Sequence, residues 1–310
     1  MKERTMRHVN SIKVIFLNVI LISALVFAGS SPALGQAGPT LSISQDFLPY
    51  QDFDEPIELD DGSTLEDAQV RLSRFRATLS YPIVFSGGRT VLVNDFSYQL
   101  IDFEYKNWEY PLSRLHAASY TLMLQHRLSQ KWSVWALGIP SMASDLKAEV
   151  SDNDFNFQVV TAFIRHFSER FSVGIGVAYS TQFGSGEFLP ILAFDWNNGK
   201  NLMARAILPA SFEFWYRPRP ILDIGLLVSG DGNNFRGDPE IYQVANPELR
   251  YTMLTVGPAM KIYVSKQIRV NLEAGLIGLH RFEFYDGDDK AGSFDLKPSQ
   301  YLRAGLQFGG

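Results

Sequence analysis

Apolar and polar residues alternate with a period of two through most of the chain beyond residue 70. In residues 171–179 the odd positions are Phe, Val, Ile, Val and Tyr, and the even positions are Ser, Gly, Gly and Ala. An α-helix, with about 3.6 residues per turn, cannot place these two sets on opposite faces, whereas a β-strand does. The chain is therefore limited to strands whose two faces meet different surroundings. The same pattern occurs at 75–81, at 222–228 (where Leu227 breaks it), at 270–276 and at 302–308.

Short and long connections alternate between these segments. Outer-membrane barrels have short turns on the periplasmic side and longer loops outside. The alternation therefore predicts an all-β fold, a transmembrane antiparallel up-and-down β-barrel. Short turns are expected at 84–89, 127–131, 167–170, 197–200, 217–220 and 264–267. The other connections are expected at 101–114, 141–154, 183–187, 229–248 and 281–298, with 209–211 as an exception in length.

The number of strands depends on one weak segment near the N-terminus. The turn at 84–89 is short and hence periplasmic, so the strand before it runs downward and an upward strand must precede it. Residues 40–47 are the only candidate, with Leu41, Ile43 and Phe47 on one face. Counting this segment gives about 14 strands, with both ends in the periplasm. If the segment is instead a periplasmic tail or an internal plug, 12 strands are the alternative.

The N-terminus has the pattern of a secretory signal peptide. Lys2, Arg4, Arg7 and Lys13 are basic, residues 14–27 are largely apolar, and small residues follow. The apolar run is shorter than the roughly 20 residues that a membrane-spanning helix needs, which argues against a retained anchor. We expect a signal peptide at 1–35, cleaved after Gly35 or Ala37, followed by a single barrel domain at 40–308.

Composition excludes several other classes of protein. The formal charge is −5, and no basic stripe is present to neutralise phosphates, so nucleic acid is not expected as a partner. The absence of cysteine excludes disulfides, thiolate metal sites, a thiol nucleophile and a lipidated N-terminus. The mean hydropathy of −0.05 is compatible with a membrane barrel, because lipid-facing and lumen-facing residues average out.

Several short segments carry a resemblance to known proteins. They are turns and strand ends at 127–132 (RLSQKW), 138–141 (GIPS), 144–145, 183–184, 189–190, 208–209 and 212–216. Together they resemble a family of bacterial outer-membrane β-barrel proteins of unknown function, over roughly residues 70 to 308. The resemblance implies the barrel fold and the outer-membrane location, and it implies no activity and no functional residue.

No motif for catalysis or for a cofactor is present. The sequence lacks a phosphate-binding loop and a G-x-S-x-G elbow, and the histidines after residue 100 lack metal-site spacing. His116 and Ser119 are an odd number of residues apart, so a strand places them on opposite faces. We therefore expect no enzyme and no cofactor.

Assigning the apolar face of each strand to lipid leaves charged and amide side chains of both signs on the inner face. About 8 strands enclose only side chains and about 16–18 leave an aqueous channel, so this barrel lies between the two cases. The inner face is either a narrow polar pore whose charges tune permeation or a network of paired charges that closes the lumen. The candidates are Arg74, Arg76, Asp95, Gln99, Thr121, Gln125, Asp195, Arg205, Glu213, Asp223, Lys261, Glu273 and Arg303.

The segment 48–69 is expected to form an acidic extracellular loop, because it holds eight acidic residues and no lysine or arginine. Clustered carboxylates suit Ca²⁺ or Mg²⁺, which also bridge lipopolysaccharide, although a solvated acidic loop is the simpler interpretation. Asp231 is assigned to a second acidic loop at 229–248, and Asp286, Asp288 and Asp289 lie in the last loop. Weak cation-binding candidates are Asp52, Asp54, Glu55, Glu58, Asp60 and Asp61.

These features favour a passive or selective outer-membrane channel for small polar solutes, located in a Gram-negative bacterium. The alternatives are a closed structural or surface-interaction barrel and, third, a lipid-modifying enzyme. The expected partners are outer-membrane lipid, lipopolysaccharide and the machinery that inserts barrels. The sequence leaves the oligomeric state open.

Overall fold

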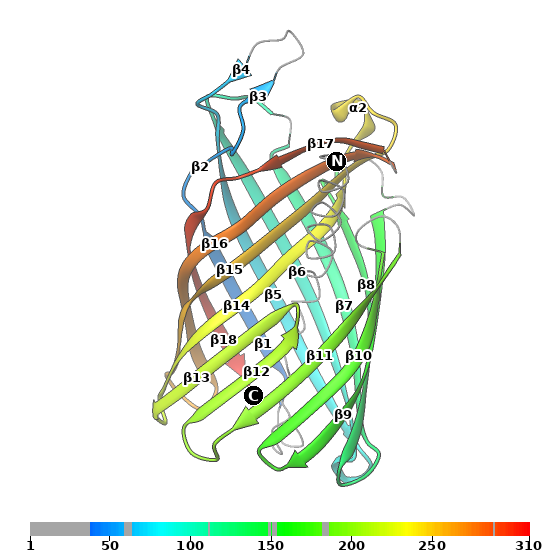
Figure 1. The fold of residues 1–310 in the computed structure, drawn as a ribbon, viewed down its shortest axis with the longest axis vertical. Coiled ribbons are helices and arrows are strands. Elements are labelled where there is room, and N and C mark those ends of the chain that lie inside the picture. Colours follow the sequence, from blue (N-terminus) through cyan, green and yellow to red (C-terminus); the bar gives the residue numbers. More distant parts are fainter. Residues whose placement is uncertain are drawn as a thin grey trace, which may run out of the picture.

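Fourteen antiparallel strands close into one barrel (Figure 1). The computed structural model describes residues 38–58, 64–110, 112–147, 150, 154–181, 186–287 and 289–310. Closure depends on β1 (Thr40–Phe47), which pairs along its whole length with β5 (Gln69–Phe85) on one side and with β18 (Ser299–Gly309) on the other. The prediction of 14 strands is confirmed, and the weak segment at 40–47 is the closing strand. The expected signal peptide lies outside the described residues.

The other strands follow one another around the barrel in chain order. A few short elements extend or cover its extracellular end: β2 (Gln51–Asp52), β3 (Ile57–Glu58), β4 (Thr64–Leu65), β17 (Asp289–Asp295) and the helix α2 (Pro239–Tyr242). The remaining barrel strands are β6 (Thr90–Lys106), β7 (Arg114–Arg127), β8 (Trp132–Ser144), β9 (Phe155–Ser168), β10 (Phe171–Ser180), β11 (Glu187–Asn197), β12 (Leu202–Leu208), β13 (Ser211–Arg219), β14 (Leu222–Arg236), β15 (Pro247–Tyr263) and β16 (Ile268–Asp286).

The outer face of the wall is apolar and exposed. Ile175 on β10 is 67% exposed and Phe188 on β11 is 73% exposed, and similar side chains occur all round the barrel. A water-soluble protein rarely leaves so much contiguous apolar surface uncovered, whereas a bilayer covers it. The outer face is therefore the lipid-facing face. Among the described residues, no helix is long and apolar enough to cross a membrane.

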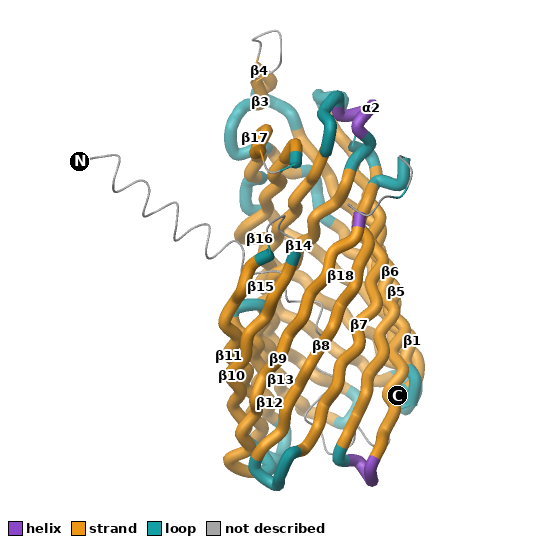
Figure 2. The backbone as a smooth tube through the Cα atoms, turned by 90° about the vertical axis from the view of Figure 1, so that its right-hand side faces the viewer, coloured by secondary structure: helices purple, strands orange, loops and turns teal. Residues whose placement is uncertain are grey.

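Short turns lie at one end of the barrel, and the longer connections, α2 and β17 lie at the other (Figure 2). The short turns occur where the sequence predicts them, for example between Phe85 and Thr90 and between Tyr263 and Ile268. The long connections are shorter than expected. The loops predicted at 101–114, 229–248 and 281–298 start later, because β6 continues to Lys106, β14 to Arg236 and β16 to Asp286.

These extensions have a physical cause. Above the lipid-facing belt, outward side chains become charged, as in the pair between Arg114 and Asp102 on β7 and β6. Their inward neighbours Ile101 and Leu115 stay buried, so the strand ladder continues although the lipid-facing pattern has ended. The strands therefore project beyond the bilayer on the extracellular side.

The barrel wall is lower on the side formed by β10 to β13 than on the side formed by β14 to β16. Strands β10 to β13 have 7 to 11 residues, whereas β14 to β16 have 15 to 19. Above the short strands, the end of β14 crosses to β8, where Arg236 forms a parallel bridge with Ser144. Asp145 N donates a hydrogen bond to Arg236 O at 3.0 Å. The upper lumen is therefore narrower than the lower lumen.

Candidate functional site

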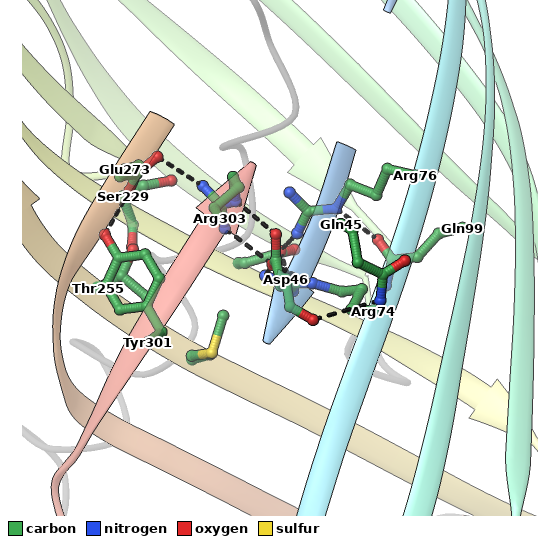
Figure 3. A network of polar contacts seen from close by, with 12 residues as sticks. Gln45, Asp46, Arg74, Arg76, Gln99, Ser229, Thr255, Glu273, Tyr301 and Arg303 are labelled. Carbon is green, nitrogen blue, oxygen red and sulfur yellow. Dashed lines mark hydrogen bonds and ion pairs between the residues drawn. The ribbon is translucent and has the colours of Figure 1, made fainter. Parts of the chain in front are cut away.

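A buried carboxylate on the closing strand is the centre of the polar contacts inside the barrel. Asp46 on β1 is 1% exposed, and in register it lies between Arg74 on β5 and Arg303 on β18. Arg74 Nε donates to Asp46 Oδ2 at 2.8 Å, and Arg303 Nε donates to Asp46 Oδ1 at 2.6 Å (Figure 3). Both carboxylate oxygens are therefore bound by guanidinium groups, which is the condition under which a buried charge is stable.

A second carboxylate reaches the same arginines from another part of the wall. Asp231 on β14 forms ion pairs with Arg74 and Arg76, both on β5. Four strands separate β14 from β5 on one side of the barrel, namely β15, β16, β18 and β1. The ion pairs of Asp231 consequently span the lumen, instead of joining neighbouring strands.

The network ends in further polar contacts on each side. Arg303 Nη1 lies 3.0 Å from Glu273 Oε2, and Tyr301 OH donates to the other oxygen of Glu273. Arg76 Nε donates to Gln99 Oε1 at 3.2 Å. We call Asp46, Arg74, Arg76, Asp231, Glu273 and Arg303 the central network. Its three carboxylates and three guanidinium groups balance in charge.

A second row of polar groups follows strands β11 to β15. Arg205 Nε lies 2.7 Å from Asp195 Oδ2 on the neighbouring strand, and Glu213 lies opposite Arg205 on β13. Lys261 Nζ lies 3.6 Å from the ring centroid of Trp215. Asp223 accepts hydrogen bonds from Arg217 at 2.5 and 2.8 Å and from Tyr263 at 2.9 Å.

The remaining inner-face candidates lie apart from both groups. Asp95 on β6 faces Thr121 on β7 in register, and its buried Oδ1 has no hydrogen-bond partner among the described residues. Gln125 lies further down β7, where its Nε2 is 3.8 Å from the sulfur of Met123. The structure thus brings Arg74, Arg76, Gln99, Glu273 and Arg303 together, and it leaves Asp95 outside that group.

The extracellular end of the lumen is filled by aromatic side chains. Phe53 and Trp108 lie edge to face with ring centroids 5.3 Å apart, and Trp108 lies 4.7 Å from Tyr110. Aromatic pairs at these separations attract each other beyond their burial alone. This packing fills part of the lumen above the central network. We call these side chains the aromatic plug: Phe53, Phe103, Tyr105, Trp108, Tyr110, Phe282, Phe284 and Phe294.

The two larger cavities beside the aromatic plug differ in size and in lining. One has a volume of about 240 Å³ and lies beside α2 and β17, lined mainly by apolar side chains that include Leu249, Phe284 and Phe294. The other has a volume of about 590 Å³ and is lined by Leu65, Tyr105, Asn107, Trp108 and Glu109. The first cavity therefore provides apolar space beside the packed rings, whereas polar groups such as Asn107 and Glu109 share the lining of the second.

The acidic loop is more than a solvated segment. Its apolar residues turn inward, since Leu48, Phe53 and Ile57 are all buried in the core cluster of the extracellular end. Asp52 accepts a hydrogen bond from Gln69 at 2.7 Å and lies 3.7 Å from Lys297 Nζ, while Asp54 and Glu55 are exposed.

The acidic candidates do not gather around a common point in the described part of the loop. There, no group of three or more acidic or histidine side chains has a spacing that could hold a metal ion. Glu58 lies on β3, its side chain lies outside the description, and Asp60 and Asp61 lie outside the described residues.

Within the described part of the chain, one serine and one histidine are hydrogen-bonded on the inner wall. Ser133 Oγ on β8 lies 2.7 Å from His166 Nε2 on β9. A hydrolytic triad would also need a group that orients the other ring nitrogen, and the hydrogen bonds of His166 within the described chain include no carboxylate. His116 points to the opposite face of its strand from the lumen and bonds Tyr98 at 2.7 Å.

Two residues of the central network were absent from the inner-face prediction. Asp46 lies on the face opposite Leu41 and Ile43, so the parity rule could have found it once 40–47 was accepted as a strand. Asp231 was assigned to the loop 229–248, and this was wrong, because β14 continues through it to Arg236. The flanking Gly230 and Gly232 remove the outward apolar side chains that mark a strand in sequence.

Comparison with known proteins gives a family and a set of similar barrels. A family model described as "Domain of unknown function (DUF6268)" matches residues 36–309. No curated protein matches the sequence.

Among solved structures, the COG4313 outer membrane channel from Pseudomonas putida F1 is similar over 91% of this chain and 99% of its own, with 11% identity and a TM-score of 0.48. The toluene transporter TodX of P. putida is similar over 91% and 93%, with 8% identity and a TM-score of 0.47. The NanC porin is similar over 86% and 98%, with 8% identity and a TM-score of 0.38.

Proposed function

The chain belongs to the DUF6268 family, and we propose that it is a gated transport channel of the bacterial outer membrane. The observation that carries this proposal is the link across the lumen, in which Asp231 on β14 is held by Arg74 and Arg76 on β5. Side chains, unlike a strand pairing, can separate and rejoin without unfolding the wall. The central network is then the gate in its closed state.

The chemistry of the network supports a gate over a purely structural filling. Removing charges from water is costly, and apolar residues of similar volume often stabilise a core as well as a buried ion pair does. A barrel that only needed a filled centre would therefore gain little from six charged groups. Charges on a pathway, in contrast, can be hydrated when the lumen opens.

The surroundings of the wall support the location. The exposed apolar belt fits the outer membrane, where lipid and lipopolysaccharide are the natural neighbours and the barrel-insertion machinery is the partner during assembly. We also propose that the chain is exported through a signal peptide, which is cleaved after Gly35 or Ala37. The intact mass of the barrel purified from outer membranes tests that cleavage. The proposal assigns no reaction to the inner face.

Conductance through planar bilayers tests the gate. The wild type should show rare, brief openings, because the central network and the aromatic plug together obstruct the lumen. Asp231→Ala removes the contact across the lumen, so the open time should rise several-fold. Combining it with Phe53→Ala, which loosens the plug, should raise the open time further.

Asp102→Ala provides a matched control. It also removes one partner of an ion pair, but that pair joins the neighbouring strands β6 and β7 on the outer face. Its open time should equal that of the wild type. A silent Asp231→Ala/Phe53→Ala protein whose folding is verified by heat-modifiable electrophoretic mobility would refute the gate.

A further inference from the structure

We propose that the cavity beside α2 is a binding site for a small, neutral, apolar molecule, and that such molecules are the substrate class of the channel. The inference rests on the proposed function, because only a transport channel gives a bound molecule somewhere to go. It differs from the expectation of small polar solutes, since a polar solute would have to leave water inside an aromatic plug.

The lining of the cavity is mainly apolar. Leu115 and Leu249 face it from β7 and β15, and Phe235 reaches it from the end of β14. Phe284 and Phe294 cover the side toward β16 and β17. Ligand sites of this kind bind through contact with apolar and aromatic side chains, and a few polar groups orient the ligand.

The volume suits a molecule of one or two rings. An engineered apolar cavity of about 150 Å³ stays dry and binds benzene. The cavity beside α2, at about 240 Å³, is larger by an amount that accommodates a second fused ring. It is too small for a folded peptide or an oligosaccharide of several units.

The charges at the cavity are already paired with each other. Arg236 Nη2 lies 2.7 Å from Glu248 Oε1, and Glu248 also accepts a hydrogen bond from Asn234 at 2.8 Å. Burial raises the pKa of Tyr110 to about 12, so its phenol is neutral at physiological pH. Ionic ligands thus find no free counter-charge here, which favours a neutral molecule.

The cavity also lies on the route to the gate. On β15, Pro247 and Leu249 line the cavity, and Tyr251 follows on the same face, with its hydroxyl 3.4 Å from Arg74 Nη1. On β15, the side chains of Leu249 and Tyr251 therefore lie between a molecule held beside α2 and the central network. This places the site at the extracellular entrance of the proposed pathway.

Equilibrium dialysis with naphthalene tests the site. The full barrel is kept in amphipol so that detergent micelles do not absorb the probe. The wild type should show a saturable component of one molecule per chain. Gly292→Leu fills the cavity, because Gly292 lines it and a Cβ there meets no atom within 4 Å. This variant should bind at least tenfold more weakly.

Gly138→Leu is the control, since Gly138 also has open space around its Cβ but its lipid-facing position on β8 is far from the cavity. It should bind like the wild type. Equal binding by Gly292→Leu, or no saturable component in a folded wild type, overturns the site. Conductance by Asp231→Ala without saturable binding would reject the site and keep the gate. Saturable binding by a barrel that never conducts would reject the gate, and with it the assignment of a substrate class, and would keep the binding site.

Discussion

Replacing Asp46 by asparagine tests whether the central network is a buried ion cluster. Asp46 is 1% exposed and accepts hydrogen bonds from Arg303 at 2.6 and 3.0 Å and from Arg74 at 2.8 Å. The substitution preserves shape but leaves three guanidinium groups facing two carboxylates. Breaking a buried ion pair from one side costs about 3–5 kcal/mol. Because each arginine keeps one carboxylate partner, we expect the lower end, about 3 kcal/mol.

The assay is urea unfolding of the barrel in phospholipid vesicles, followed by tryptophan fluorescence. Asp102→Asn is the reference, because the pair between Asp102 and Arg114 has a similar distance of 2.6 Å but is 42% and 57% exposed. An exposed pair contributes about 0–1 kcal/mol, so this variant should unfold nearly like the wild type. If Asp46→Asn loses less than about 1 kcal/mol, the network is hydrated and our reasoning about its burial is wrong.

Three further predictions concern the plug and the wall. Phe53→Ala should lower the free energy of unfolding by about 3 kcal/mol, measured in the same urea assay, because it opens a void among packed rings. Gly257→Val should prevent closure of β15 on β16, since a Cβ there would lie 2.7 Å from Gly275 Cα, whereas Gly138→Val should fold; heat-modifiable mobility reports both. Because burial raises the pKa of Tyr110 to about 12 from its usual value near 10, its contribution to stability is complete below pH 10 and is lost as pH rises toward 12. Tyr110→Phe should make the decline in the unfolding free energy above pH 10 less steep without abolishing it, because burial also raises the pKa of Tyr242. An unchanged pH profile would contradict this prediction.

The alternation of apolar and polar residues along the strands was sufficient to predict most of the fold. It needs only neighbouring residues, because each side chain points to the face opposite its neighbour, and the two sides of a barrel wall differ in polarity. Even the weak segment that became β1 could be deduced, since the strand that runs down to the short turn at 84–89 requires an upward strand before it. The extracellular extensions could not be deduced in this way. In these extensions the outer face of a strand meets water, as Asp102 and Glu104 do on β6. The outer side chains are then polar, and the regular alternation of apolar and polar residues that predicts a strand is lost.

The contacts between side chains inside the barrel were harder to predict from the sequence. Parity selected Arg74, Arg303 and Glu273 for the inner face but not their partners, because partners across the lumen depend on how strands tilt and close. Asp231 is 157 residues from Arg74, and no local pattern relates them. The plug had a visible signal in the aromatic residues at 105–110, which are unusual in a solvent-exposed loop.

The crossing of β14 to β8 has a consequence for the order of assembly. Hairpins such as β12 to β13 join residues close in the sequence, so they can form early, whereas the bridge from Ser144 to Arg236 encloses five intervening strands. Contacts between distant residues form slowly, because a long loop must close first. We therefore expect the upper lumen to narrow only after those strands have entered the membrane. During insertion the barrel would pass through a form with a wider upper lumen.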